Sequence, residues 1–129
     1  MSFEIVQSAG VPTSHLPFSP ALRVGPWLYM SGQASVDNSG QIVSDDFAGE
    51  MRRSMENVKK ILSAAGLRLS DVVQTRNYVG SQDDLAEFNQ IYPEFFRQPY
   101  PARTTITGCL GNLLKYEIDV VAYATNQAE

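Results

Sequence analysis

The chain has 129 residues, 43% of them hydrophobic and 19% charged, which is typical of one folded domain and excludes a disordered protein. The formal net charge is −4, and the scattered basic residues form no patch that would neutralise a nucleic-acid backbone. No segment approaches the roughly 20 apolar residues that cross a bilayer, and the N-terminus lacks a signal-peptide pattern. The single cysteine, Cys109, cannot form an internal disulfide. We therefore expect one domain, residues 1–129, in the cytoplasm.

The first third of the chain predicts short strands and ordered loops. Residues 3–8 (FEIVQS) alternate enough to form a short strand, and residues 9–20 contain three prolines but no helical periodicity. Two further strands flank the turn dipeptide Gly25-Pro26, which indicates a hairpin. Residues 36–43 (VDNSGQIV) are typical of another turn.

Two helices follow from the spacing of apolar residues. The first begins near Asp45 and Asp46, whose charges favour a helix N-terminus, and ends before Gly66. Its apolar face contains Phe47, Met51, Met55, Val58, Leu62 and Ala65. The second helix spans residues 81–96, and Pro93 kinks this helix or ends its regular part. Its buried stripe contains Leu85, Phe88, Tyr92 and Phe95.

The remaining segments complete an α+β domain with a mixed β-sheet and two helices packed on one face. Residues 71–80, 102–109 and 116–125 are rich in β-branched and aromatic residues and predict strands. The strand–helix–strand order in the middle favours parallel neighbours, and hairpins at both ends favour antiparallel pairing. The last strand has apolar residues on both alternations. The second face of the sheet therefore needs a partner surface, and we expect self-association.

Few residues offer catalytic chemistry. His15 and Cys109 are the only residues of their kind, which excludes a zinc site built from them and leaves no assignable nucleophile–base pair. We interpret His15 as a solvated loop residue and Cys109 as a small packing residue. No metal site is expected.

Arg103 is the strongest candidate for ligand binding. Pro101 holds it at the start of a strand, and its planar guanidinium suits a two-pronged contact with a carboxylate. Glu117 opens the strand that we expect beside it, so an inter-strand salt bridge is an equally good interpretation of the pair. Gly32, in the segment SGQ, allows either close approach of a ligand or a simple β-bulge.

Seven segments, in order and spacing, resemble the reactive intermediate/imine deaminase (RidA-like) family: PFSPAL, LYMSGQ, MENVKKILSAAG, DVVQTRNYV, FNQIYPEFF, PARTTI and YEIDVVA. The resemblance implies a chorismate-mutase-like fold and a homotrimer with a barrel-like centre and sites between subunits. It implies hydrolysis of enamines and imines, such as 2-aminoacrylate and 2-iminopropanoate, to 2-oxo acids and ammonia without a cofactor.

The resemblance also assigns roles to individual positions. Arg103 matches the arginine that binds the substrate carboxylate, and Glu117 matches the acid that positions or activates water. The substrate-binding positions are Phe18, Gly32, Asn89, Arg103 and Thr105. Phe18 stands where many members have tyrosine, so a hydroxyl contact is lost. Thr105 stands where cysteine is common, which matters little if only its backbone takes part.

Two other functions remain open at this point. The same cleft could bind 2-oxo acids or amino acids without turnover, as a regulatory protein would, and Phe18 keeps this alternative open. Endoribonuclease or translation-inhibitor activity is attributed to some members of the family. The acidic charge of this chain argues against it, because an RNA-binding surface is usually basic.

Overall fold

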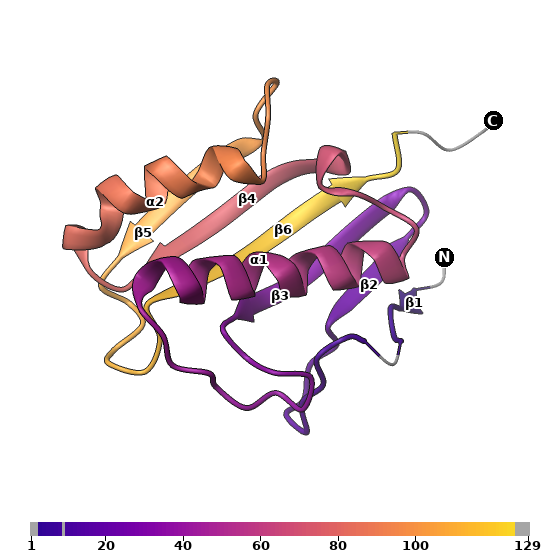
Figure 1. Cartoon of the computed structure of the whole chain (residues 1–129). Coiled ribbons are helices and arrows are strands. Elements are labelled where there is room, and N and C mark those ends of the chain that lie inside the picture. Colours follow the sequence, from indigo (N-terminus) through magenta and orange to yellow (C-terminus); the bar gives the residue numbers. More distant parts are fainter. Residues whose placement is uncertain (1–2, 9, 126–129) are drawn as a thin grey trace.

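The computed structural model describes residues 3–8 and 10–125, which form one six-stranded sheet with two helices on one face (Figure 1). The helices are α1 (Phe47–Ala64) and α2 (Leu85–Ile91). The strands are β1 (Glu4–Ile5), β2 (Ala21–Val24), β3 (Trp27–Ala34), β4 (Val72–Val79), β5 (Ala102–Thr107) and β6 (Tyr116–Tyr123). The expected α+β architecture with a mixed sheet is confirmed. No helix among the described residues is long and apolar enough to span a membrane.

The strand order is β1-β2-β3-β6-β4-β5, and among the described strands only the β4–β5 pair is parallel. The predicted β2–β3 hairpin and the parallel pair around α2 are confirmed. The expectation that the last two strands are neighbours is wrong, because β6 lies between β3 and β4 and pairs antiparallel with both. The connection of residues 108–115 passes the end of β4, where the Gly80 N–H donates to the Lys115 carbonyl at 2.9 Å. This eight-residue connection is long enough to carry the chain past β4 instead of turning back in a hairpin.

The core lies between the sheet and the helices. Asp46 caps the N-terminus of helix α1, where its side chain accepts a hydrogen bond of 2.8 Å from the Gly49 N–H, and Gly66 follows the end of the helix with φ of +75°. Its predicted apolar positions from Phe47 to Leu62 are buried. Pro93 falls in a 3₁₀ turn directly after α2, as the sequence predicts.

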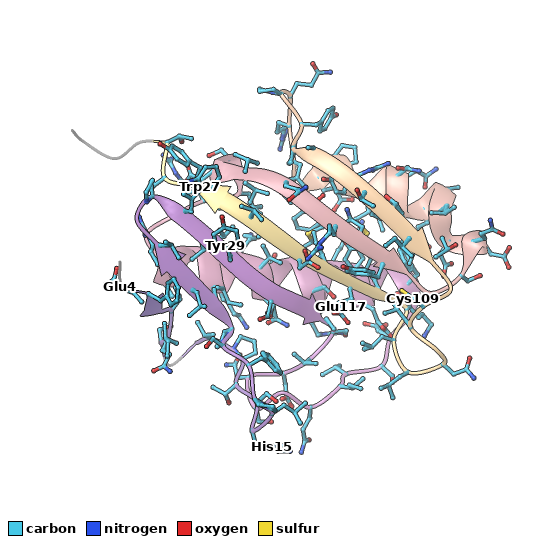
Figure 2. The ribbon with its side chains drawn as sticks, turned by 180° about the vertical axis from the view of Figure 1, so that it is seen from behind. Glu4, His15, Trp27, Tyr29, Cys109 and Glu117 are labelled. Carbon is cyan, nitrogen blue, oxygen red and sulfur yellow. The ribbon has the colours of Figure 1, made fainter. Side chains whose placement is uncertain are left out.

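The central strand β6 separates two different surfaces. Tyr116, Ile118, Val120 and Ala122 are buried under the helices. The intervening residues, from Glu117 to Tyr123, face the side of the sheet that none of the described helices covers. Figure 2 shows this open face with Trp27, Tyr29 and Glu117 on it, and both labelled aromatic side chains are exposed. The expected uncovered face is therefore present in the chain.

Candidate functional site

The structure divides the predicted site residues into two groups. The Arg103 group comprises Asn89, Arg103 and Thr105, and the Glu117 group comprises Phe18, Gly32 and Glu117. Each group has its own surroundings, and the side of the sheet that each occupies follows from strand register and burial.

Arg103 lies at the outer strand of the sheet, on the face that carries the helices. Its Cζ atom is 4.9 Å from the ring centroids of both Phe88 and Tyr92. Its side chain is otherwise exposed, and among the described residues it forms no salt bridge or hydrogen bond. The guanidinium is thus a cation that lies against two aromatic rings and pairs with no carboxylate of the described part of the chain.

A pocket of about 290 Å³ adjoins this guanidinium. It is lined by Asn89, Tyr92, Pro93, Tyr100, Pro101 and Arg103. Thr105 follows two residues later on β5, is partly buried and pairs with Asn77 of β4, so it shares the face of Arg103. The pocket therefore joins an unpaired cation to mostly apolar walls, an arrangement that suits a small anionic organic ligand.

Glu117 occupies the open face (Figure 2). Strand β3 is irregular between Met30 and Gln33, so the predicted bulge at Gly32 is present. A Cβ atom at Gly32 would overlap the Glu117 Oε2 atom, and the space above this glycine is therefore filled by the carboxylate. Gly32 thus permits the close approach of an acidic side chain of the same chain.

The environment of Glu117 favours its neutral form. Burial raises the pKa of its carboxyl group, and the negative charge of Asp119 raises it further. Asp119 itself accepts hydrogen bonds from Arg76 Nε and from the Tyr78 hydroxyl, each at 2.8 Å. A carboxyl group with a raised pKa is suited to exchange protons with a substrate or water.

The Pro-rich loop is tied to the same bulge. The Ser31 N–H donates to the Pro20 carbonyl at 2.9 Å, and Ser31 Oγ donates to the Ser19 carbonyl at 2.6 Å. Phe18 precedes this anchored segment, and its side chain is 52% exposed. Phe18 lines a pocket together with Ile5 of β1 and with residues of the same loop, Val11 and Pro20 among them.

The two groups do not meet within one chain. Strand β4 lies between β5, which carries Arg103, and β6, which carries Glu117. Arg103 pairs with the buried Thr75 on the helix side, whereas Glu117 pairs with Tyr78 on the open side. The interpretation of Arg103 and Glu117 as an inter-strand salt bridge is therefore wrong for the isolated chain.

The aromatic surface under Arg103 was not predicted from the sequence. Phe88 and Tyr92 were predicted only as core residues of the second helix, and nothing in their spacing singles out an arginine as their partner. His15 is exposed in its loop, as expected, but Cys109 is also exposed, so its interpretation as a packing residue is wrong. Among the described residues, no cluster of three His, Cys, Asp or Glu side chains could hold a metal ion.

A family model described as endoribonuclease L-PSP matches residues 9–124. The chain belongs to this family, the RidA-like proteins. A RutC family protein of Pyrococcus horikoshii is 34% identical, over 93% of this chain and 97% of the relative. The human 2-iminobutanoate/2-iminopropanoate deaminase is 33% identical, over 92% of this chain and 88% of the relative.

Solved structures of the family share the fold. TdcF of Escherichia coli with bound serine is 30% identical with a TM-score of 0.82, and the match covers 93% of this chain and 98% of TdcF. RidA of a Psychrobacter species is 29% identical with a TM-score of 0.85, with the same coverage of both chains. The mixed sheet with two helices is thus the architecture of this family.

Proposed function

We propose that this protein hydrolyses reactive enamines and imines of the 2-aminoacrylate/2-iminopropanoate class to 2-oxo acids and ammonia. The observation that carries the proposal is the Arg103 guanidinium, which pairs with none of the described carboxylates and lies beside a pocket of about 290 Å³. A guanidinium can bind both oxygens of a substrate carboxylate. Relatives of about 33% identity named as imine deaminases support the choice of reaction.

The proposed reaction needs little machinery. Arg103 holds the carboxylate and thereby fixes the imine carbon, while Glu117 removes a proton from the attacking water. The oxygen bonds to the imine carbon, the C=N double bond becomes single, and Glu117 passes the water proton to the nitrogen, which gives a neutral carbinolamine. Glu117 then takes the hydroxyl proton as the C=O double bond forms and passes it to the nitrogen as the C–N bond breaks, leaving a 2-oxo acid and ammonia. The raised pKa of Glu117 suits both transfers.

We propose further that the site is completed by a second copy of the chain. Because the two groups lie on opposite faces, a contact that joins Arg103 of one copy to Glu117 of the next uses two different surfaces. Such head-to-tail contacts form a ring when the rotation between successive copies closes. A homotrimer with the chorismate-mutase-like arrangement, its open sheet faces around a barrel-like centre, would cover Trp27 and Tyr29. We place the protein in the cytoplasm, where the exposed thiol of Cys109 would stay reduced.

The test is steady-state release of ammonia from 2-iminopropanoate, generated in the assay by an amino-acid oxidase acting on alanine. We expect the wild-type protein to accelerate hydrolysis above the spontaneous rate and Arg103→Ala to lose that acceleration. Wild-type rates equal to the spontaneous rate, with the protein folded and assembled, would contradict the proposal.

A second candidate is a protein that binds 2-oxo acids or amino acids at the same site without turnover. Phe18 favours it, because a phenyl ring offers no hydroxyl to the reacting atoms. Saturable binding of pyruvate without acceleration of hydrolysis would select this function. Endoribonuclease activity is the weaker alternative for a chain of net charge −4. RNA cleavage that persists in Arg103→Ala would belong to another surface or to a contaminant.

A further inference from the structure

Beneath Arg103 lies a chain of buried polar side chains that the proposed reaction does not use. The buried network comprises Thr75, Asn77, Tyr92 and Tyr116, none more than 4% exposed. The Tyr116 hydroxyl donates to Asn77 Oδ1, and Asn77 Nδ2 donates to Thr75 Oγ1 at 3.0 Å. Thr75 Oγ1 lies 2.8 Å from the Tyr92 hydroxyl, which completes the chain from β6 through β4 to the end of α2.

Polar groups in this position are unusual, because the facing surfaces of the sheet and helices are otherwise largely apolar. Burying an amide and three hydroxyl groups disfavours folding unless each finds a partner. Here each does, and among the described residues no buried side-chain nitrogen or oxygen lacks a hydrogen bond. A fully satisfied network allows few alternative rotamers, and it therefore holds the Tyr92 ring in one orientation.

That ring is one of the two on which Arg103 lies. Asn77 Nδ2 also reaches the Thr104 carbonyl, at 3.4 Å, so the network contacts the backbone of β5 next to Arg103. The arginine is exposed on an outer strand, and no carboxylate of the described residues pairs with it. Its direction therefore depends on the rings of Phe88 and Tyr92 and on the strand that carries it.

We infer that the buried network positions the Arg103 guanidinium for the carboxylate, which makes Tyr92 and Asn77 positioning residues of the site. This inference rests on the proposed carboxylate contact of Arg103. Neither residue needs to touch the ligand, because each acts through the arginine. A network that only stabilises the fold would instead leave the affinity for carboxylates unchanged.

Two variants separate these cases. Tyr92→Phe keeps the ring under Arg103 and removes only its hydroxyl group, whereas Asn77→Leu breaks the middle of the network. The matched control is Ser54→Ala, which removes a buried hydroxyl that donates to the Glu50 carbonyl at 2.8 Å within α1, away from Arg103. With pyruvate as the probe in calorimetry, we expect Kd to rise about threefold to tenfold in both test variants and to stay unchanged in the control.

The inference requires that Tyr92→Phe changes pyruvate affinity only through Arg103. In an Arg103→Lys background, Tyr92→Phe should therefore cause no further loss of pyruvate affinity, because the two changes remove the same contact. Unchanged Kd values in both test variants overturn the inference. An equal further loss in the Arg103→Lys background also overturns it, since the network would then act on something else.

A spectroscopic signal provides a readout that does not depend on catalysis. Ring currents of Phe88 and Tyr92 should displace the Arg103 Nε–H resonance, and the displacement should shrink in Tyr92→Phe. An undisplaced resonance in the wild-type protein overturns the inference even if Asn77→Leu fails to fold or pyruvate binds too weakly to measure. If pyruvate binds through Arg103 but no imine is hydrolysed, the proposed deaminase activity fails while the positioning role stands.

Discussion

Arg103 and Glu117 lie on opposite faces of one sheet, and strand β4 separates the strands that carry them. Arg103 is beside Thr75 on the helix side, and Glu117 is beside Tyr78 on the open side. A reaction that uses both side chains therefore needs two copies of the chain that meet through different surfaces. This relationship makes the assembly part of the catalytic hypothesis.

The first prediction is complementation between two inactive proteins. Arg103→Ala and Glu117→Gln subunits, mixed at random into trimers, should recover about a quarter of wild-type activity. Three quarters of such trimers contain both kinds of subunit. In each of these mixed trimers, one of the three sites has an intact Arg103 and an intact Glu117. Ammonia release before and after subunit exchange measures the recovery. Mixed trimers, verified by native mass spectrometry, that remain inactive would place the site within one copy.

The second prediction concerns Arg103→Lys. Lysine keeps the charge but loses the planar fork, and a hydrogen bond to a charged group contributes about 1.5–3 kcal/mol. We expect kcat/KM to fall about tenfold to a hundredfold. Thermal stability should change little, because an exposed cation–π contact contributes only about 0.5–1 kcal/mol. A large loss of stability with full activity of the folded fraction would identify Arg103 as a structural residue.

The third prediction concerns Gly32→Ala. The added methyl group would occupy the position of the Glu117 carboxylate, whose flexible end can move away. We therefore expect lower turnover with little change in melting temperature. Pyruvate affinity should persist, since Arg103 belongs to the other group. Unchanged turnover would show that the reaction does not depend on the Glu117 carboxylate lying above Gly32.

The fourth prediction concerns Glu117→Gln. Turnover should fall about 10²–10⁴-fold, because the amide cannot exchange protons, while pyruvate binding stays nearly intact. The free energy of unfolding, in contrast to turnover, should increase in this variant. Burial raises the pKa of Glu117 in the folded protein, so ionisation destabilises the fold as the pH rises from the ordinary value of 4.5 through the raised value.

At neutral pH the glutamine variant should therefore be more stable than the wild type. The difference should vanish well below pH 4.5, where glutamate is protonated in both the folded and unfolded states. Denaturant unfolding at several pH values measures it. A variant that is less stable at neutral pH would mean that the Glu117 carboxylate makes a favourable contact in the assembled protein.

The fifth prediction concerns the acidic limb of the pH–rate profile. If Glu117 acts as the base, activity should rise with pH through its raised pKa. Asp119→Asn removes the negative charge that contributes to this shift, so the limb should move to lower pH. Burial is the larger cause, and the limb should therefore stay above the ordinary glutamate value. A limb that does not move would indicate that another group controls the profile.

Local elements were predictable from the sequence, because they depend on neighbouring residues. The four-residue spacing from Phe47 to Met51 and Met55 identified the buried face of α1, and Gly25-Pro26 identified the hairpin turn. The order of strands was not predictable in the same way. A strand of β-branched residues pairs equally well with several neighbours, and the connection of residues 108–115 permits either a hairpin or a passage over β4.

One signal did point to the correct order. Strand β6 is apolar on both alternations, which is typical of a central strand rather than of a hairpin at an edge. The buried network could not be predicted from the sequence, because Asn77 and Tyr116 are 39 positions apart and only the register of β4 with β6 brings them together. The separation of the two site groups depends on the same register.

Strand β5 ends the described sheet, and its outer N–H and C=O groups face no other strand of the chain. An open edge of this kind invites pairing with another extended segment and hence aggregation. Such pairing is limited by the short length of the strand, by its polar sequence ARTTIT and by the flanking Pro101 and Gly108. The strand that presents the arginine to a ligand is therefore also an edge that its own sequence protects against pairing with other chains.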